Sequence, residues 1–136
     1  MKIILDSNVI LSAFASDGLC KSVFILCVEQ NTILTSKHIL DEIKRGFLGK
    51  FKMPATGVDK ISRYLHDICI IGDFKELDEQ VCRDLDDDKV LALAKDSEAD
   101  YIVTGDKDLL VLKQYGPTRI VSPREFWEIS KKAGMR

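Results

Sequence analysis

The chain has 136 residues, of which 46% are hydrophobic and 31% are charged, and its formal net charge at pH 7 is -2. This length and composition are those of one globular domain, which we place at residues 1–136. No apolar stretch is long enough to span a bilayer, no signal peptide opens the chain, and no strongly basic field is present to hold nucleic acid passively. We therefore expect a cytoplasmic protein with no membrane contact.

The cysteines and histidines indicate neither a zinc site nor a hydrolase triad. None of the four cysteines forms a C-x-x-C pair, so we expect free thiols in a reducing compartment. Neither His38 nor His66 has a serine or cysteine motif beside it.

The predicted elements begin with a strand. Residues 3–5 form an unbroken apolar run, typical of a strand buried on both faces, and the run stops at Asp6. Helices are predicted over 9–14 and 22–29, followed by a second strand over 32–35. Asp6 either caps the first helix or belongs to a site at the carboxyl ends of the strands, where open α/β sheets bind ligands.

A helix is predicted after Ser36, a plausible N-cap, with its apolar side chains on one stripe. On the helical wheel Asp41 points away from this stripe. Glu42 lies at its margin, where the side chain can lean over the sheet edge. Glutamates at helix margins are commonly just solvated. Glu42 alone therefore does not indicate a site, and it becomes a candidate ligand only if other acids lie near it.

Residues 46–57 are predicted to be a broken helix and loop. An amphipathic helix over 59–67, a strand over 69–71 and a polar linker over 72–79 follow. The next segment, 83–88, holds four aspartates just ahead of an Ala- and Leu-rich helix. One aspartate is routine at a helix start, but four repel one another. Either some are solvated loop charges, or a cation such as Mg²⁺ or Mn²⁺ holds them.

The last part of the chain repeats the pattern of the first. A buried strand over 101–104 ends in a polar turn that contains Asp106 and Asp108, and a short helix follows. A last strand over 118–121 leads to the capping box of a final helix, Ser122-Pro123-Arg124-Glu125. This order predicts the α/β class, a three-layer α/β/α sandwich with a mostly parallel central sheet.

Together these motifs resemble the PIN domain family over nearly the whole chain. The nearest resemblance is to small single-domain PIN proteins described as toxin components of toxin–antitoxin pairs, similar to VapC ribonucleases. Leu85 departs from the pattern, since this subgroup usually has proline there. The resemblance rests on four motifs in this order and spacing: Asp6-Ser7-Asn8; Glu42 in the helix after the second strand; Arg83-Asp84-Leu85-Asp86-Asp87-Asp88 before Leu91-Ala92-Leu93-Ala94; and Thr104-Gly105-Asp106-Lys107-Asp108-Leu109-Leu110.

The resemblance implies a catalytic and metal-binding set of four acids around Mg²⁺ or Mn²⁺. Asp108 would be a fifth ligand, and Asn8 and Thr104 would support the ligands or orient water. Asp88 is chosen among the aspartates because the family's acid precedes a Leu-Ala pair by three residues, here Leu91-Ala92. The four acids are Asp6, Glu42, Asp88 and Asp106.

The implied function is that of a metal-dependent endoribonuclease. Carboxylate-held metals can activate water and stabilise the leaving oxygen of a phosphodiester. RNA as the substrate, a cognate antitoxin and a homodimer come only from the resemblance.

Three alternatives remain open at this point. A phosphatase of the haloacid-dehalogenase type also begins with a strand that ends in Asp, but it normally has Asp where this chain has Asn8. A receiver domain would need a Lys at the end of its last strand, which is absent here. The third alternative is a non-catalytic interaction module derived from a PIN domain.

Overall fold

The computed structural model describes residues 1–134, which form seven helices and six strands. Residues 135–136 of the predicted domain lie outside this part. The strands are β1 (Lys2–Leu5), β2 (Thr32–Thr35), β3 (Cys69–Ile71), β4 (Tyr101–Val103), β5 (Gln114–Tyr115) and β6 (Thr118–Val121). The helices are α1 (Ser7–Ala15), α2 (Leu19–Gln30), α3 (Lys37–Gly49), α4 (Ala55–Ile68), α5 (Leu85–Ser97), α6 (Lys107–Leu110) and α7 (Pro123–Lys132).

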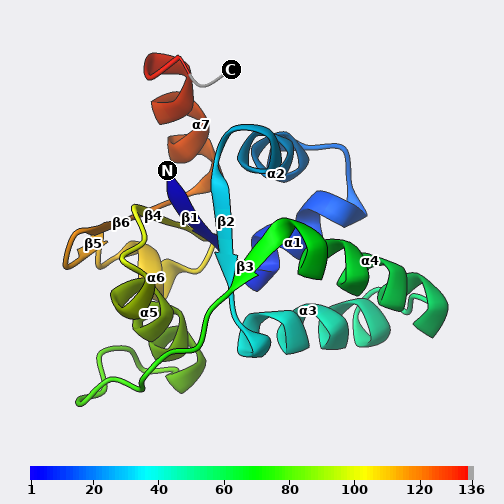
Figure 1. Ribbon diagram of the computed structural model, residues 1–136, viewed down its shortest axis with the longest axis horizontal. Coiled ribbons are helices and arrows are strands. Elements are labelled where there is room, and N and C mark those ends of the chain that lie inside the picture. Colours follow the sequence, from blue (N-terminus) through cyan, green and yellow to red (C-terminus); the bar gives the residue numbers. More distant parts are fainter. Residues whose placement is uncertain (135–136) are drawn as a thin grey trace.

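The strands form one sheet in the order β3-β2-β1-β4-β6-β5. Every neighbouring pair is parallel except β5 and β6, which form a short antiparallel hairpin. Helices α1 to α4 lie on one side of the sheet, and α5 and α6 lie on the other (Figure 1). The predicted α/β class, a three-layer sandwich with a mostly parallel sheet, is confirmed.

Strand β1 lies at the centre of the hydrophobic core. Its residues Ile3, Ile4 and Leu5 have no exposed surface, as expected for a parallel strand covered on both faces. The chain runs outward from β1 through β2 to β3 and then returns to β4 on the other side of β1. The strand order therefore reverses between β1 and β4, and open α/β sheets bind ligands beyond the carboxyl ends of such a pair.

The helices and strands fall close to their predicted positions, with two differences. The predicted break over 46–57 is shorter than expected, because α3 continues to Gly49 and α4 begins at Ala55. Strand β5 was not predicted. It consists of only Gln114 and Tyr115, and it exists because Gly116, in the left-handed conformation (φ 57°), folds this pair back onto β6.

Within residues 1–134, no single helix is long and apolar enough to cross a membrane. Helices α1 and α2 reach that length and apolarity only when taken together, and they are bent by 108° relative to each other.

Helices α1 and α3 approach each other closely at Gly46. A Cβ atom at this position would lie 2.7 Å and 2.8 Å from the two Cδ atoms of Leu11, whose side chain is buried. The close approach sets the spacing between α1, which follows Asp6, and α3, which carries Glu42.

We expect Gly46→Ala to give a less stable protein than Gly49→Ala, by about 2 kcal/mol. Alanine favours the helix at both positions, but at Gly46 it also forces Leu11 out of its place in the core. Gly49 is the matched control, since a Cβ there has no neighbour within 4 Å. Urea denaturation of the two variants measures the difference, and equal stabilities would show that Leu11 moves at no cost.

Candidate functional site

Asp6 is fixed in the space beyond β1 by two hydrogen bonds. Its Oδ1 accepts the Ser7 backbone N–H at 2.8 Å, and its Oδ2 accepts the Thr104 hydroxyl at 2.7 Å. Only 6% of the residue is exposed. Asp6 therefore caps α1, and the Thr104 hydroxyl connects it to the turn that follows β4.

Thr104 connects the ends of β1 and β4. Its hydroxyl donates to Asp6 and accepts the backbone N–H of Asp106 at 3.0 Å. Asp106 in turn caps α6, because its Oδ1 accepts the Asp108 N–H at 2.8 Å. Thr104 is fully buried.

The acid of α5 that faces Asp106 is Asp87. The carboxylate oxygens of Asp87, Asp106 and Asp108 all lie within 4.8 Å of one another. Asp87 is 7% exposed, and its Oδ2 is buried without a hydrogen-bond partner. An unpartnered buried carboxylate oxygen is costly, so this atom is well placed to accept a cation.

The structure places Asp88, the aspartate chosen from the sequence, outside this carboxylate group. Its Oδ2 accepts the Val81 N–H at 2.9 Å and its Oδ1 accepts the Cys82 N–H at 2.7 Å. Both oxygens thus hold the loop over 72–84 against the start of α5. Asp88 also lines a pocket of about 160 Å³ between that loop and α5, which neither Asp6, Asp87 nor Asp106 lines.

The burial pattern of α5 explains why the sequence did not distinguish these two aspartates. Residues 90–94 are all buried, so the apolar pattern leaves the rotation of the helix undefined. One weak signal was present further along. One turn further along, Leu91 and Ala92 are both buried, but two turns further along Asp87 is followed by the buried Ala94 and Asp88 by the exposed Lys95.

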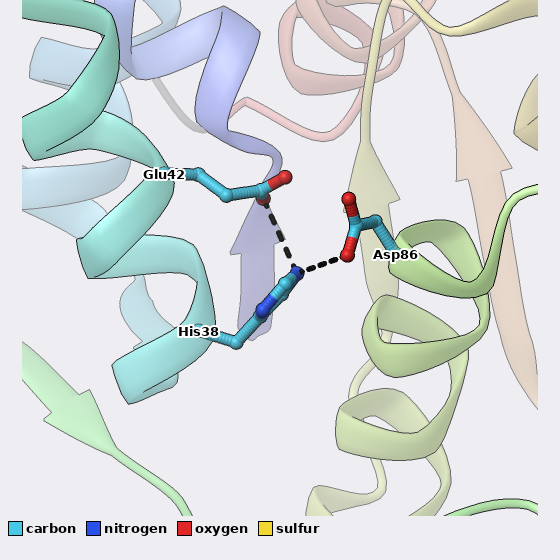
Figure 2. A group of neighbouring side chains, drawn as sticks. All are labelled: His38, Glu42 and Asp86. Carbon is cyan, nitrogen blue, oxygen red and sulfur yellow. Dashed lines mark ion pairs between the residues drawn. The ribbon is translucent and has the colours of Figure 1, made fainter.

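Glu42 reaches the same region from α3, but it belongs to a second group of side chains. Its Oε1 lies 3.7 Å from His38 Nε2, which lies 3.3 Å from Asp86 Oδ1 on α5 (Figure 2). Neither His38 nor Asp86 was predicted to belong to the site. The four-residue spacing of His38 and Glu42 was the available signal, since it places both side chains on one helix face.

Burial and mutual repulsion raise the carboxyl pKa values at this edge. Burial raises the pKa of Glu42 to about 7, and Asp6 and Asp86 add to the shift. Burial also raises the pKa of Asp6, against the opposing effect of the Thr104 hydrogen bond. The pKa of Asp87 is raised by burial and by Asp106. The pKa of His38 is lowered, mainly by burial and then by Lys89.

The other two expected residues lie at the margin. Asn8 is exposed on the first turn of α1. Asp108 is partly exposed, and its Oδ1 forms an ion pair with Arg83 Nη2 at 2.7 Å. Asp108 is therefore near Asp87 and Asp106 but is already neutralised by a cation of the chain.

The donor set suits a hard divalent cation. Asp87, Asp106 and Asp108 offer only carboxylate oxygens, which Mg²⁺ and Mn²⁺ prefer. The unpartnered Oδ2 of Asp87 and the raised pKa values of Asp6 and Asp87 indicate a surplus of negative charge that a cation would relieve.

Comparisons with known proteins agree with this architecture. Residues 2–108 match the PIN domain. The chain is also 30% identical over 148 aligned positions to an uncharacterized protein, MJ1680, of Methanocaldococcus jannaschii, covering 97% of this chain and 93% of that protein. The chain belongs to the PIN domain family, whose members are typically metal-dependent nucleases.

Asn substitutions at the adjacent aspartates are expected to have opposite effects on the metal-free protein. Asp87→Asn removes one of several crowded charges and should raise stability by about 1 kcal/mol. Asp88→Asn places an amide against a backbone N–H and should lower stability by about 2 kcal/mol. Thermal melts in EDTA test both, and shifts of the same sign would contradict the division of roles between them.

The stability of the metal-free protein should fall as the pH rises from 4.5 to about 7. Over this range the folded state binds more protons than the unfolded chain, because the pKa of Glu42 is raised, and so stability decreases with pH. Glu42 should contribute about 1 kcal/mol after allowance for solvent screening.

Melts in EDTA between about pH 5 and about pH 7.5 measure this slope. Glu42→Gln should flatten it, and an unchanged slope in that variant would show that Glu42 is not its source. With Mn²⁺ present, the gain in melting temperature should instead grow with pH, because the ligands must be deprotonated.

Proposed function

We propose that this chain is an endoribonuclease that depends on Mg²⁺ or Mn²⁺. The observation that carries the proposal is the grouping of Asp87 with Asp106 and Asp108 beyond β4, where the buried Oδ2 of Asp87 has no partner. Thr104 connects this group to Asp6 beyond β1. The chain's membership of the PIN domain family supports a nuclease reaction. The cation, when bound, would polarise the phosphodiester and lower the pKa of the attacking water.

The residues of the chain would hold the reacting groups in place. Thr104 holds the Asp6 carboxylate and the backbone of Asp106, and the Asp106 carboxylate accepts the Asp108 N–H, so both carboxylates are oriented before substrate arrives. Glu42 is partly exposed, and in the metal-free chain its pKa is raised to about 7, so it would accept a proton from the attacking water when it is not itself bound to the cation. Asp87 takes the place of Asp88 in the catalytic and metal-binding set.

Basic side chains flank these acids and could contact the RNA backbone. Arg83 pairs with Asp108 at one side, and the charges of Lys89 and Arg45 act on His38 at the other. Because the net charge of the chain is -2, binding of RNA would depend on these local cations together with the metal.

The cellular role we propose is that of a toxin in a toxin–antitoxin pair. This part of the proposal rests on the resemblance of the motifs to small single-domain PIN proteins. A cognate antitoxin and a second copy of this chain are the partners it implies. The exposed aromatic side chains of Phe14 on α1 and Tyr64 on α4, next to Ile25 on α2, offer an apolar face away from the acids.

The test is cleavage of single-stranded RNA by the purified chain. We expect cleavage with Mg²⁺ or Mn²⁺ and none in EDTA. Glu42→Gln should lower the rate by about 10²- to 10⁴-fold, as expected for loss of a group that transfers a proton. Its matched control is Asp41→Asn, the neighbouring acid on α3, which should change the rate by less than about threefold because Asp41 lies outside the two carboxylate groups.

Two results would reject the proposal that the chain is a metal-dependent nuclease. One is cleavage that is undiminished by the chelator. The other is release of phosphate from monoesters with no action on RNA, which is the outcome expected of a phosphatase. Equal losses in Glu42→Gln and Asp41→Asn would instead reject the role of Glu42.

A further inference from the structure

His38 lies where two helices bring carboxylates together. It shares one face of α3 with Glu42, one turn away, and Asp86 approaches from the first turn of α5 (Figure 2). The Nε2 atom lies 3.3 Å from Asp86 Oδ1 and 3.7 Å from Glu42 Oε1. The ring thus points toward the two acids.

The ring nitrogen lacks a hydrogen bond. Nε2 of His38 is buried and has no hydrogen-bond partner among the described residues, although two carboxylates face it. The side chain is only 15% exposed. A polar atom in this position is costly unless something satisfies it, and the two facing acids would also repel each other if both were ionised.

The three side chains make a mixed nitrogen and oxygen donor set. One ligand atom from each of His38, Glu42 and Asp86 lies within 4.8 Å of the other two. Imidazole suits transition metals, whereas Mg²⁺ and Ca²⁺ prefer oxygen alone. The set shares no residue with Asp87, Asp106 and Asp108, which form the all-oxygen group on the other side of the first turn of α5.

We propose that His38, Glu42 and Asp86 bind a divalent transition-metal cation, with His38 Nε2 as a nitrogen ligand, at a position beside the all-carboxylate group. The inference rests on the proposed function to the extent that Glu42 belongs both to the proposed catalytic residues and to this group of ligands. It adds a ligand from outside the four acids and predicts that this position prefers Mn²⁺ to Mg²⁺, because a transition-metal ion accepts an imidazole nitrogen more readily than Mg²⁺ does.

The experiment is pulsed electron paramagnetic resonance of the untagged, full-length protein loaded with Mn²⁺. Nitrogen coordinated to Mn²⁺ produces a hyperfine modulation that oxygen ligands do not. The chain has only two histidines, and His66 lies on α4 with its Nδ1 bonded to the Ser62 carbonyl at 2.9 Å. His66→Gln is therefore the matched control for His38→Gln.

We expect the nitrogen modulation in the wild type and in His66→Gln, and its loss in His38→Gln. The His66→Gln protein is decisive by itself, since His38 is then the one histidine left. Calorimetric titration with Mn²⁺ should show the affinity of this position falling at least about tenfold in His38→Gln, because even residues that only support a metal ligand contribute about that much. Titration with Mg²⁺ should change little.

Three outcomes would overturn the inference. These are no binding of Mn²⁺, bound Mn²⁺ without nitrogen modulation in the wild type, and modulation that persists in His38→Gln. The second outcome would leave His38 as a charge partner of Asp86 and Glu42. The RNA assay separates this inference from the nuclease proposal. Metal-dependent cleavage without nitrogen modulation rejects only His38 as a ligand. Nitrogen modulation together with chelator-resistant cleavage rejects only the metal-dependent nuclease.

Discussion

The Thr104 hydroxyl joins the two strands on which the acidic site is built. It donates to Asp6 after β1 and accepts the backbone N–H of Asp106 after β4. The Asp106 carboxylate in turn accepts the Asp108 N–H, so neutral groups of the framework orient both carboxylates. Repulsion between the two carboxylates lowers the stability of the fold, and burial of the core around β1 offsets this loss. Such a loss of stability is common at functional sites.

Most of the fold could be predicted because its signals are local. The apolar run over 3–5 and the capping box at Ser122 each define an element without reference to the rest of the chain. Strand β5 could not be predicted in this way. It has two residues, and it exists only through its pairing with β6.

The site was less predictable than the fold, because it depends on the rotation of helices. The boundary of the stripe on α3 distinguishes Glu42 from Asp41, since that helix is buried on one face only. On α5 the burial is nearly all round, and Asp87 could not be separated from Asp88 by pattern alone. His38 meets Asp86 only when α3 and α5 are placed on the sheet, so no local pattern could have joined them.

The run Asp86-Asp87-Asp88 consists of identical residues with three different surroundings. Asp86 faces His38, Asp87 faces Asp106, and Asp88 holds Val81 and Cys82. Because the three residues are identical and consecutive, deletion of any one of them produces the same polypeptide. No deletion can therefore remove only the aspartate with one particular set of contacts. Such a deletion would rotate the preceding segment by about 100° relative to α5 and leave two acids for three places. The length of this run is therefore under as much constraint as the identity of its residues, although a gap of one residue within it would look harmless in an alignment.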